Sequence, residues 1–154
     1  MLNNLYVKNF LYALAVVFFG FNLLVLAFVL NWFTTAFIKL FFPPGFPAAN
    51  PWFAQLALVI YLIIIAYISW LIFRSKLEEI FKGIYSTVPS AVTFAVTWLL
   101  LEQWLVLAYG VCALILLIII YYLCRTKKSW RYYFPVILVA SVLLMMNILG
   151  LEIL

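Results

Sequence analysis

The segment from Gln103 to Cys124 reads QWLVLAYGVCALILLIIIYYLC and contains no charged residue. At a rise of about 1.5 Å per residue, a helix of this length crosses a hydrocarbon core about 30 Å thick. Comparable charge-free stretches lie between Lys8 and Lys39, Lys39 and Arg74, Lys82 and Glu102, and Arg131 and Glu152. The pattern predicts an all-α, polytopic membrane protein with five transmembrane helices.

Composition favours the same class of protein. Hydrophobic residues make up 71% of the chain and charged residues only 8%, whereas about a quarter of the residues in a soluble domain are charged. Runs such as Leu114 to Ile120 lack the alternating polar positions that a transmembrane β-barrel requires. We predict a single transmembrane helical domain over residues 1–154. Its spans are expected at about residues 10–30, 52–73, 84–101, 104–122 and 132–152.

The basic residues predict how the chain is oriented. If every stretch crosses once, Lys8 and the loops 74–83 and 125–131 share one face and hold eight of the nine basic residues, with Lys39 alone opposite. The positive-inside rule makes the richer face cytoplasmic, so the N-terminus lies inside and the C-terminus outside. A four-span alternative, in which residues 83–124 cross once, requires a helix of about 63 Å. We therefore predict a multi-pass protein of the cell (inner) membrane, with an organellar membrane as the alternative.

The connection from Asn31 to Pro51 is predicted to be a loop, and it is unusually apolar. Phenylalanine and proline make up much of it, and the prolines prevent a helix from continuing. To keep its aromatic rings away from water, the loop must lie in the bilayer interface, fold over the helix ends, or contact a partner subunit.

The connection after Arg74 predicts a short amphipathic helix. Ser75 and Glu78 have the spacing of a capping box, and Glu78 and Lys82 have the spacing of an ion pair on one helix face. Gly83 is then expected to end that helix. We expect the apolar side chains of this helix to face the acyl chains.

Polar and small residues inside the spans predict contacts between helices. Asn22 and Asn147 lie well within spans, where a carboxamide commonly forms an interhelical hydrogen bond. Small residues recur at four-residue spacing in the third and fourth spans, as at Ser86 and Ser90, Ala91 and Ala95, and Ala108 and Cys112. Because small side chains let helix backbones approach closely, these two spans are predicted to form a tight hairpin.

The inventory of reactive side chains is short. The chain has no histidine and no aspartate, and its glutamates are Glu78, Glu79, Glu102 and Glu152. A Ser/His/Asp or Cys/His catalytic site cannot be built from this chain alone, nor can a histidine-containing zinc, haem or di-iron site. We predict no catalytic site, no metal site and no bound cofactor. The basic residues flank apolar spans, where anionic headgroups account for them, so no nucleic-acid partner is predicted.

Two candidate binding sites remain. Glu102 is the only ionisable residue that interrupts the apolar region between Lys82 and the polybasic loop, so it is a candidate ion or proton site. The five-span arrangement puts Glu102 in the turn between the third and fourth spans, where water solvates it. A helix shift into the bundle would instead favour proton coupling. The polybasic loop, which predicts contacts with anionic lipid headgroups, contains Arg125, Lys127, Lys128 and Arg131.

These observations leave three functional classes. The missing acid–base groups and the apolar 31–51 connection favour a non-catalytic integral membrane subunit, or an assembly or stabilising factor, of a larger membrane protein complex. The alternative is a small oligomeric carrier or channel with Glu102 as its proton-coupling or selectivity residue. A lipid-handling enzyme that uses Glu102 and Tyr109 is the third class. The expected partners are other membrane subunits and a lipid bilayer with anionic headgroups.

Overall fold

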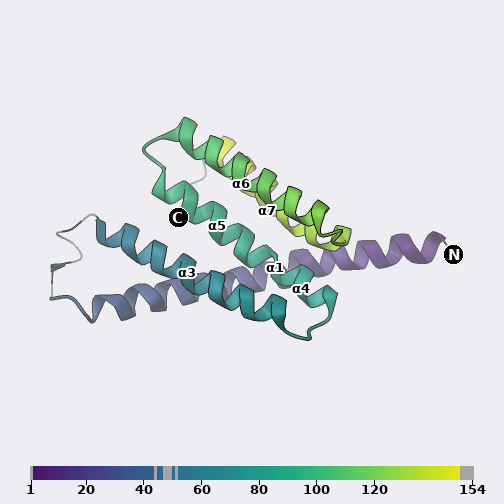
Figure 1. Cartoon of the computed structure of the whole chain (residues 1–154), viewed down its shortest axis with the longest axis horizontal. Helices are drawn as coiled ribbons and strands as arrows, with labels where there is room; N and C mark the ends of the chain where they lie inside the picture. The colour runs from purple at the N-terminus through teal and green to yellow at the C-terminus, as the bar shows by residue number, and fades with distance from the viewer. Residues whose placement is uncertain (1, 44, 47–49, 51, 150–154) are drawn as a thin grey trace.

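Figure 1 shows the computed structural model, which describes residues 2–43, 45–46, 50 and 52–149, with side chains from residue 6 onward. Its helices are α1 (Leu2–Lys39), α3 (Trp52–Arg74), α4 (Glu79–Tyr85), α5 (Thr87–Leu100), α6 (Leu105–Arg125) and α7 (Trp130–Ile148). Five segments within this part of the chain are long and apolar enough to cross a membrane, and α4 and α5 together form the third. No strand occurs among these residues, so the prediction of an all-helical fold is confirmed, and the five long apolar segments fit a multi-pass membrane protein.

α5 lies at the centre of the bundle and packs against α1, α3, α6 and α7 (Figure 1). The span formed by α4 and α5 is also the most buried and least hydrophobic of the five. Two of its buried hydroxyl groups are satisfied within the span, since Ser90 Oγ donates to the Ser86 carbonyl at 2.8 Å and Thr87 Oγ1 to the Ile84 carbonyl at 2.7 Å. A Cβ at Gly20 of α1 would lie only 3.1 Å from Thr87 Oγ1. Small residues and satisfied hydroxyls therefore let α1 and α5 approach closely.

The connections of the bundle gather at its two ends. Connections 74–79 and 125–130 meet at one end, where Lys128 contacts Glu79, and this end is called the basic end below. The α5–α6 turn and the start of α3 lie together at the opposite end, where Gln55 is close to residues 99–104.

α1 is longer than the first predicted span. It contains 38 residues, which corresponds to a length of about 57 Å, and it continues through Lys39 rather than ending at Leu30. The expectation of a loop that begins at Asn31 is therefore wrong. No glycine or proline follows until Pro43, so nothing in the sequence stops the helix earlier. The N-terminal part of α1 extends past the other helices at the basic end (Figure 1).

Aromatic rings of the connection between α1 and α3 pack over the helix ends. Phe42 stacks on Phe46, with ring centroids 4.9 Å apart, and meets Phe53 of α3 edge-on at 5.4 Å. Ile38 at the end of α1 joins Phe53 and Ala57 in the same apolar cluster. The sequence allowed three locations for this loop, and the structure shows that its described residues fold over the helix ends. Residues 44, 47–49 and 51 lie outside the described part.

The connection between α3 and α4 differs from its prediction. Ser75 Oγ donates to the Ile72 carbonyl at 2.6 Å and α4 begins only at Glu79, so no capping box forms. Lys82 Nζ donates to the Ser75 carbonyl at 2.7 Å, and no ion pair joins it to Glu78 among these described side chains. A bond from Lys82 to the carbonyl just after the end of α3 thus replaces the predicted i,i+4 pair.

Gly83 does not end a helix, because α4 continues to Tyr85. The Tyr12 hydroxyl of α1 lies where a Cβ at Gly83 would stand, and the Arg131 carbonyl of α7 would lie 3.2 Å from that Cβ. Gly83 is therefore required for the close packing of three helices rather than for a helix stop. The local sequence suggested a stop because glycine commonly follows the end of a helix. It could not show the packing partners of Gly83, which lie far away along the chain.

The other spans agree with prediction within a few residues. α3 begins at the predicted Trp52 and ends at Arg74, and α6 covers the predicted fourth span. The fifth span was predicted to reach Glu152. α7 runs over Trp130–Ile148, and residues 150–154 lie outside the described part of the chain.

Candidate functional site

Glu102 lies in the turn that joins α5 to α6, at the end opposite the basic end. The Trp104 N–H donates to the Leu101 carbonyl at 2.8 Å and closes the turn. The side chains of Glu102 and Gln103 are exposed, and together with Gln55 they line a hollow of about 380 Å³. Glu102 is the only ionisable residue along its wall. The carboxylate thus lies in a solvent-accessible turn, as the five-span arrangement predicted, and not between the helices.

The polybasic loop begins as a helix C-terminal cap. The Lys128 N–H donates to the Leu123 carbonyl and the Lys127 N–H to the Cys124 carbonyl, both at 3.1 Å. Lys127 has a φ of 49°, in the left-handed region that usually requires glycine or asparagine. This pair of hydrogen bonds is the Schellman motif, and it reverses the chain sharply between α6 and α7.

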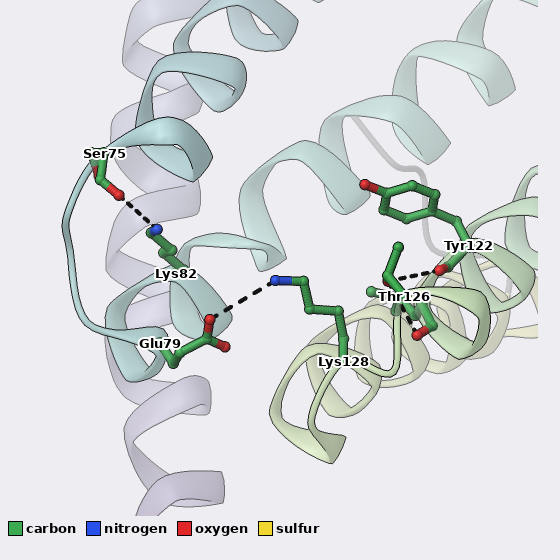
Figure 2. A network of polar contacts seen from close by, with 7 residues as sticks. Ser75, Glu79, Lys82, Tyr122, Thr126 and Lys128 are labelled. Carbon is green, nitrogen blue, oxygen red and sulfur yellow. Dashed lines mark hydrogen bonds and ion pairs between the residues drawn. The ribbon is translucent and has the colours of Figure 1, made fainter.

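Figure 2 shows how the polybasic loop contacts α4 at the basic end. Lys128 Nζ lies 3.9 Å from Glu79 Oε1, which is the one ion pair among the described residues. Lys128 Nζ also lies 5.2 Å from the centre of the Tyr132 ring, and the Arg131 guanidinium lies 5.6 Å from the centre of the Tyr12 ring. Both groups therefore already have intramolecular partners, whereas Arg125 and Lys127 form no ion pair or cation–π contact among the described residues. Of the four predicted headgroup contacts, these last two are the most available to lipid.

The structure separates the two asparagines that the sequence grouped together. The Tyr109 hydroxyl of α6 donates to Asn147 Oδ1 of α7, so the interhelical bond predicted for Asn147 is confirmed. Asn22 forms no interhelical bond among the described residues. Asn22 Nδ2 donates to the Phe18 carbonyl of its own helix at 2.8 Å, and its side chain is exposed on the outside of the bundle.

Tyrosine hydroxyls form a set of interhelical contacts that sequence reasoning missed. Tyr12 donates to the Arg131 carbonyl and Tyr61 to the Ala27 carbonyl, both at 2.9 Å. Tyr85 lies 3.2 Å from Ser69 Oγ, and Ser69 donates its own proton to the Ile65 carbonyl. With Tyr109, four tyrosines link α1 to α7, α3 to α1, α4 to α3 and α6 to α7. The local sequence gives no signal for these bonds, because each tyrosine bonds to a different helix from its own.

A cavity of about 300 Å³ lies between α5, α6 and α7. Its wall is apolar except for the Tyr109–Asn147 pair, and Trp98 meets the Tyr109 ring edge-on with centroids 5.1 Å apart. Cys112 also lines it, whereas Cys124 is exposed near the basic end.

The described residues contain no group of three or more Cys, Asp or Glu side chains close enough to hold a metal ion. Comparison of the chain with protein-family models, with curated proteins and with solved structures finds no match.

Proposed function

We propose that the protein is a non-catalytic integral membrane subunit, or an assembly or stabilising factor, of a larger membrane protein complex. In this proposal the basic end faces the cytoplasm and the Glu102 turn faces outward. The observation that carries the proposal is the position of Asn22, a carboxamide on the uncovered side of α1.

Asn22 is on the side of α1 that the rest of the chain leaves uncovered. The covered side contains Tyr12, Val16, Gly20, Ala27, Thr34 and Ile38. The neighbours of Asn22 on the uncovered side, Phe18 and Val25, are exposed. Asn22 lies ten residues along the helix from Tyr12, or about 15 Å from the basic end, so it is within the hydrocarbon core.

A carboxamide at this depth favours association with another helix. Its hydrogen bond to the Phe18 carbonyl uses one N–H, and Asn22 Oδ1 has no partner among the described residues. Lipid offers no donor to that oxygen, whereas a polar side chain on a neighbouring transmembrane helix does. Such interhelical bonds contribute about 0.6–2 kcal/mol each. The partner we propose is therefore a transmembrane helix of another subunit that carries a hydrogen-bond donor at the depth of Asn22.

The test is co-purification from the native membrane in a mild detergent, comparing the wild type with Asn22→Leu. Asn22 is outside the bundle, so the variant should fold normally while losing its partner chain. Ser141→Leu is the matched control, because Ser141 is an exposed polar residue on α7. It should keep the partner. If wild type and Asn22→Leu retain the same chains equally, or if the wild type emerges alone as a symmetric oligomer, the proposal is wrong.

The carrier alternative draws on one observation, the hollow that Glu102 and Gln55 line. A carrier would lose proton-coupled flux in proteoliposomes on Glu102→Gln, whereas a non-catalytic subunit would keep both its complex and the activity of that complex. Glu102 is exposed in a turn, so the helices do not surround it and shield it from water. Because proton coupling relies on a carboxyl group that is shielded from bulk water, the geometry favours the subunit over the carrier.

A further inference from the structure

The cavity between α5, α6 and α7 exists because small side chains face one another where the three helices meet. Ala95 of α5, Cys112 and Ala113 of α6, and Ala140 of α7 all line it. Trp98, Phe94 and Leu116 complete an almost wholly apolar wall. A volume of about 300 Å³ is at the lower end of the range in which proteins bind small apolar molecules.

The polar pair lies at the outer edge of this cavity. Tyr109 is four residues from the start of α6, about 6 Å along its axis, and Asn147 is one residue from the end of α7. Leu116, at the far end, is eleven residues from the start of α6, about 16 Å along the axis. The cavity therefore runs from the edge of the hydrocarbon core toward the middle of the bilayer, which is the course of a lipid tail below its ester group.

The hydrogen bonds at the polar pair define what the cavity can accept. The Tyr109 hydroxyl donates to Asn147 Oδ1, which fixes the orientation of the carboxamide. Asn147 Nδ2 then presents its N–H groups, and no described residue accepts from them. The matching ligand has a hydrogen-bond acceptor at one end and a hydrocarbon chain behind it. An ester carbonyl with its acyl chain fits both requirements.

We propose that this cavity binds one acyl chain of a glycerolipid, with the ester carbonyl accepting a hydrogen bond from Asn147 Nδ2. The surrounding bilayer supplies the ligand at high concentration, and its ester groups lie at the depth of the polar pair. The bound lipid would fill the space between three helices and strengthen their packing. This inference is independent of the proposed partner helix at Asn22, which is on a different surface of the bundle.

The experiment is native mass spectrometry of the full chain released from mild detergent, with phospholipid counted per chain. Wild type should retain one glycerolipid, identified by mass. Ala140→Leu, which fills the cavity, should lower occupancy about tenfold, equivalent to about 1.4 kcal/mol. Ala54→Leu is the matched control, because Ala54 is exposed on α3, and it should retain the lipid.

A second variant tests the proposal independently in case Ala140→Leu does not fold. Asn147→Leu removes the donor while keeping a side chain of similar size, and it should lower occupancy about fivefold. The proposal fails if Ala140→Leu and Asn147→Leu both retain the wild-type lipid. It also fails if wild type carries no lipid, or carries an apolar molecule that is not a glycerolipid.

Discussion

The Tyr12 hydroxyl of α1 donates a hydrogen bond of 2.9 Å to the backbone carbonyl of Arg131 in α7, across 119 positions of sequence. Pro135 explains why that carbonyl is available, since it lies four residues further along α7 and has no N–H to donate back to Arg131. A side chain from another helix therefore satisfies a carbonyl that the proline leaves open. The bond joins the first and last spans of the bundle at the basic end.

The Tyr12–Arg131 bond predicts a measurable coupling with Pro135. Tyr12→Phe should lower the free energy of unfolding by about 1 kcal/mol, because it leaves the Arg131 carbonyl without a donor. Pro135→Ala restores the N–H that the helix lacks. In that background Tyr12→Phe should cost clearly less, because the carbonyl is already paired. Unfolding of the four variants in mixed micelles gives the double-mutant cycle. If Tyr12→Phe lowers the free energy of unfolding equally in both backgrounds, the Tyr12 hydrogen bond does not replace the backbone bond that Pro135 lacks.

The close packing at Gly83 predicts opposite effects for two glycine substitutions. Gly83→Ala should destabilise the protein by about 1–3 kcal/mol, because the added Cβ meets the Tyr12 hydroxyl and the Arg131 carbonyl. Gly110→Ala should stabilise it by up to about 1 kcal/mol, because no atom lies within 4 Å of the added Cβ and alanine favours a helix. Thermal unfolding of both variants provides the comparison. The prediction is wrong if Gly83→Ala is as stable as Gly110→Ala.

Removing the hydroxyl group from three different tyrosines should have three different effects on the stability of the protein. Tyr61→Phe should destabilise the protein by about 1 kcal/mol, because it removes the buried hydrogen bond to Ala27. Tyr67 is exposed on the same helix, so Tyr67→Phe should have little effect. Tyr132 is 4% exposed and its hydroxyl has no partner among the described residues. Tyr132→Phe should therefore increase stability, because it removes the cost of burying an unpaired donor. The check is to measure the denaturation midpoints of the three variants under the same conditions. Equal midpoints for all three would contradict this account.

The orientation predicts which compartment reaches each connection. In a background with Cys112→Ser and Cys124→Ser, a membrane-impermeant thiol reagent should label Lys39→Cys in intact cells and Lys127→Cys only after permeabilisation. The reason is the excess of basic residues at the basic end, which the positive-inside rule places in the cytoplasm. Labelling of both cysteines from the same side would overturn the five-span arrangement. Exclusive labelling of Lys127→Cys in intact cells would reverse the orientation instead.

The sequence by itself determined the class of protein, the approximate ends of most spans and the location of Glu102 in a turn. These features depend on one physical requirement, that charges and loop backbones stay out of the hydrocarbon core. That requirement is local, so it can be recognised without knowing how the helices pack. It also allowed the basic residues to be grouped correctly at one end of the bundle.

Only the tertiary structure decided which face of each helix is covered. In a soluble protein the apolar stripe reveals the buried face, but both faces of a span such as α6 are apolar because one of them meets lipid. The roles of Gly83 and Tyr12 could not be predicted for that reason, since both contact α7, which is distant in sequence. The exposure of Asn22 could not be predicted either, because it depends on which side of α1 the other helices cover. The cavity beside Asn147 likewise arises only where the small residues of three helices meet.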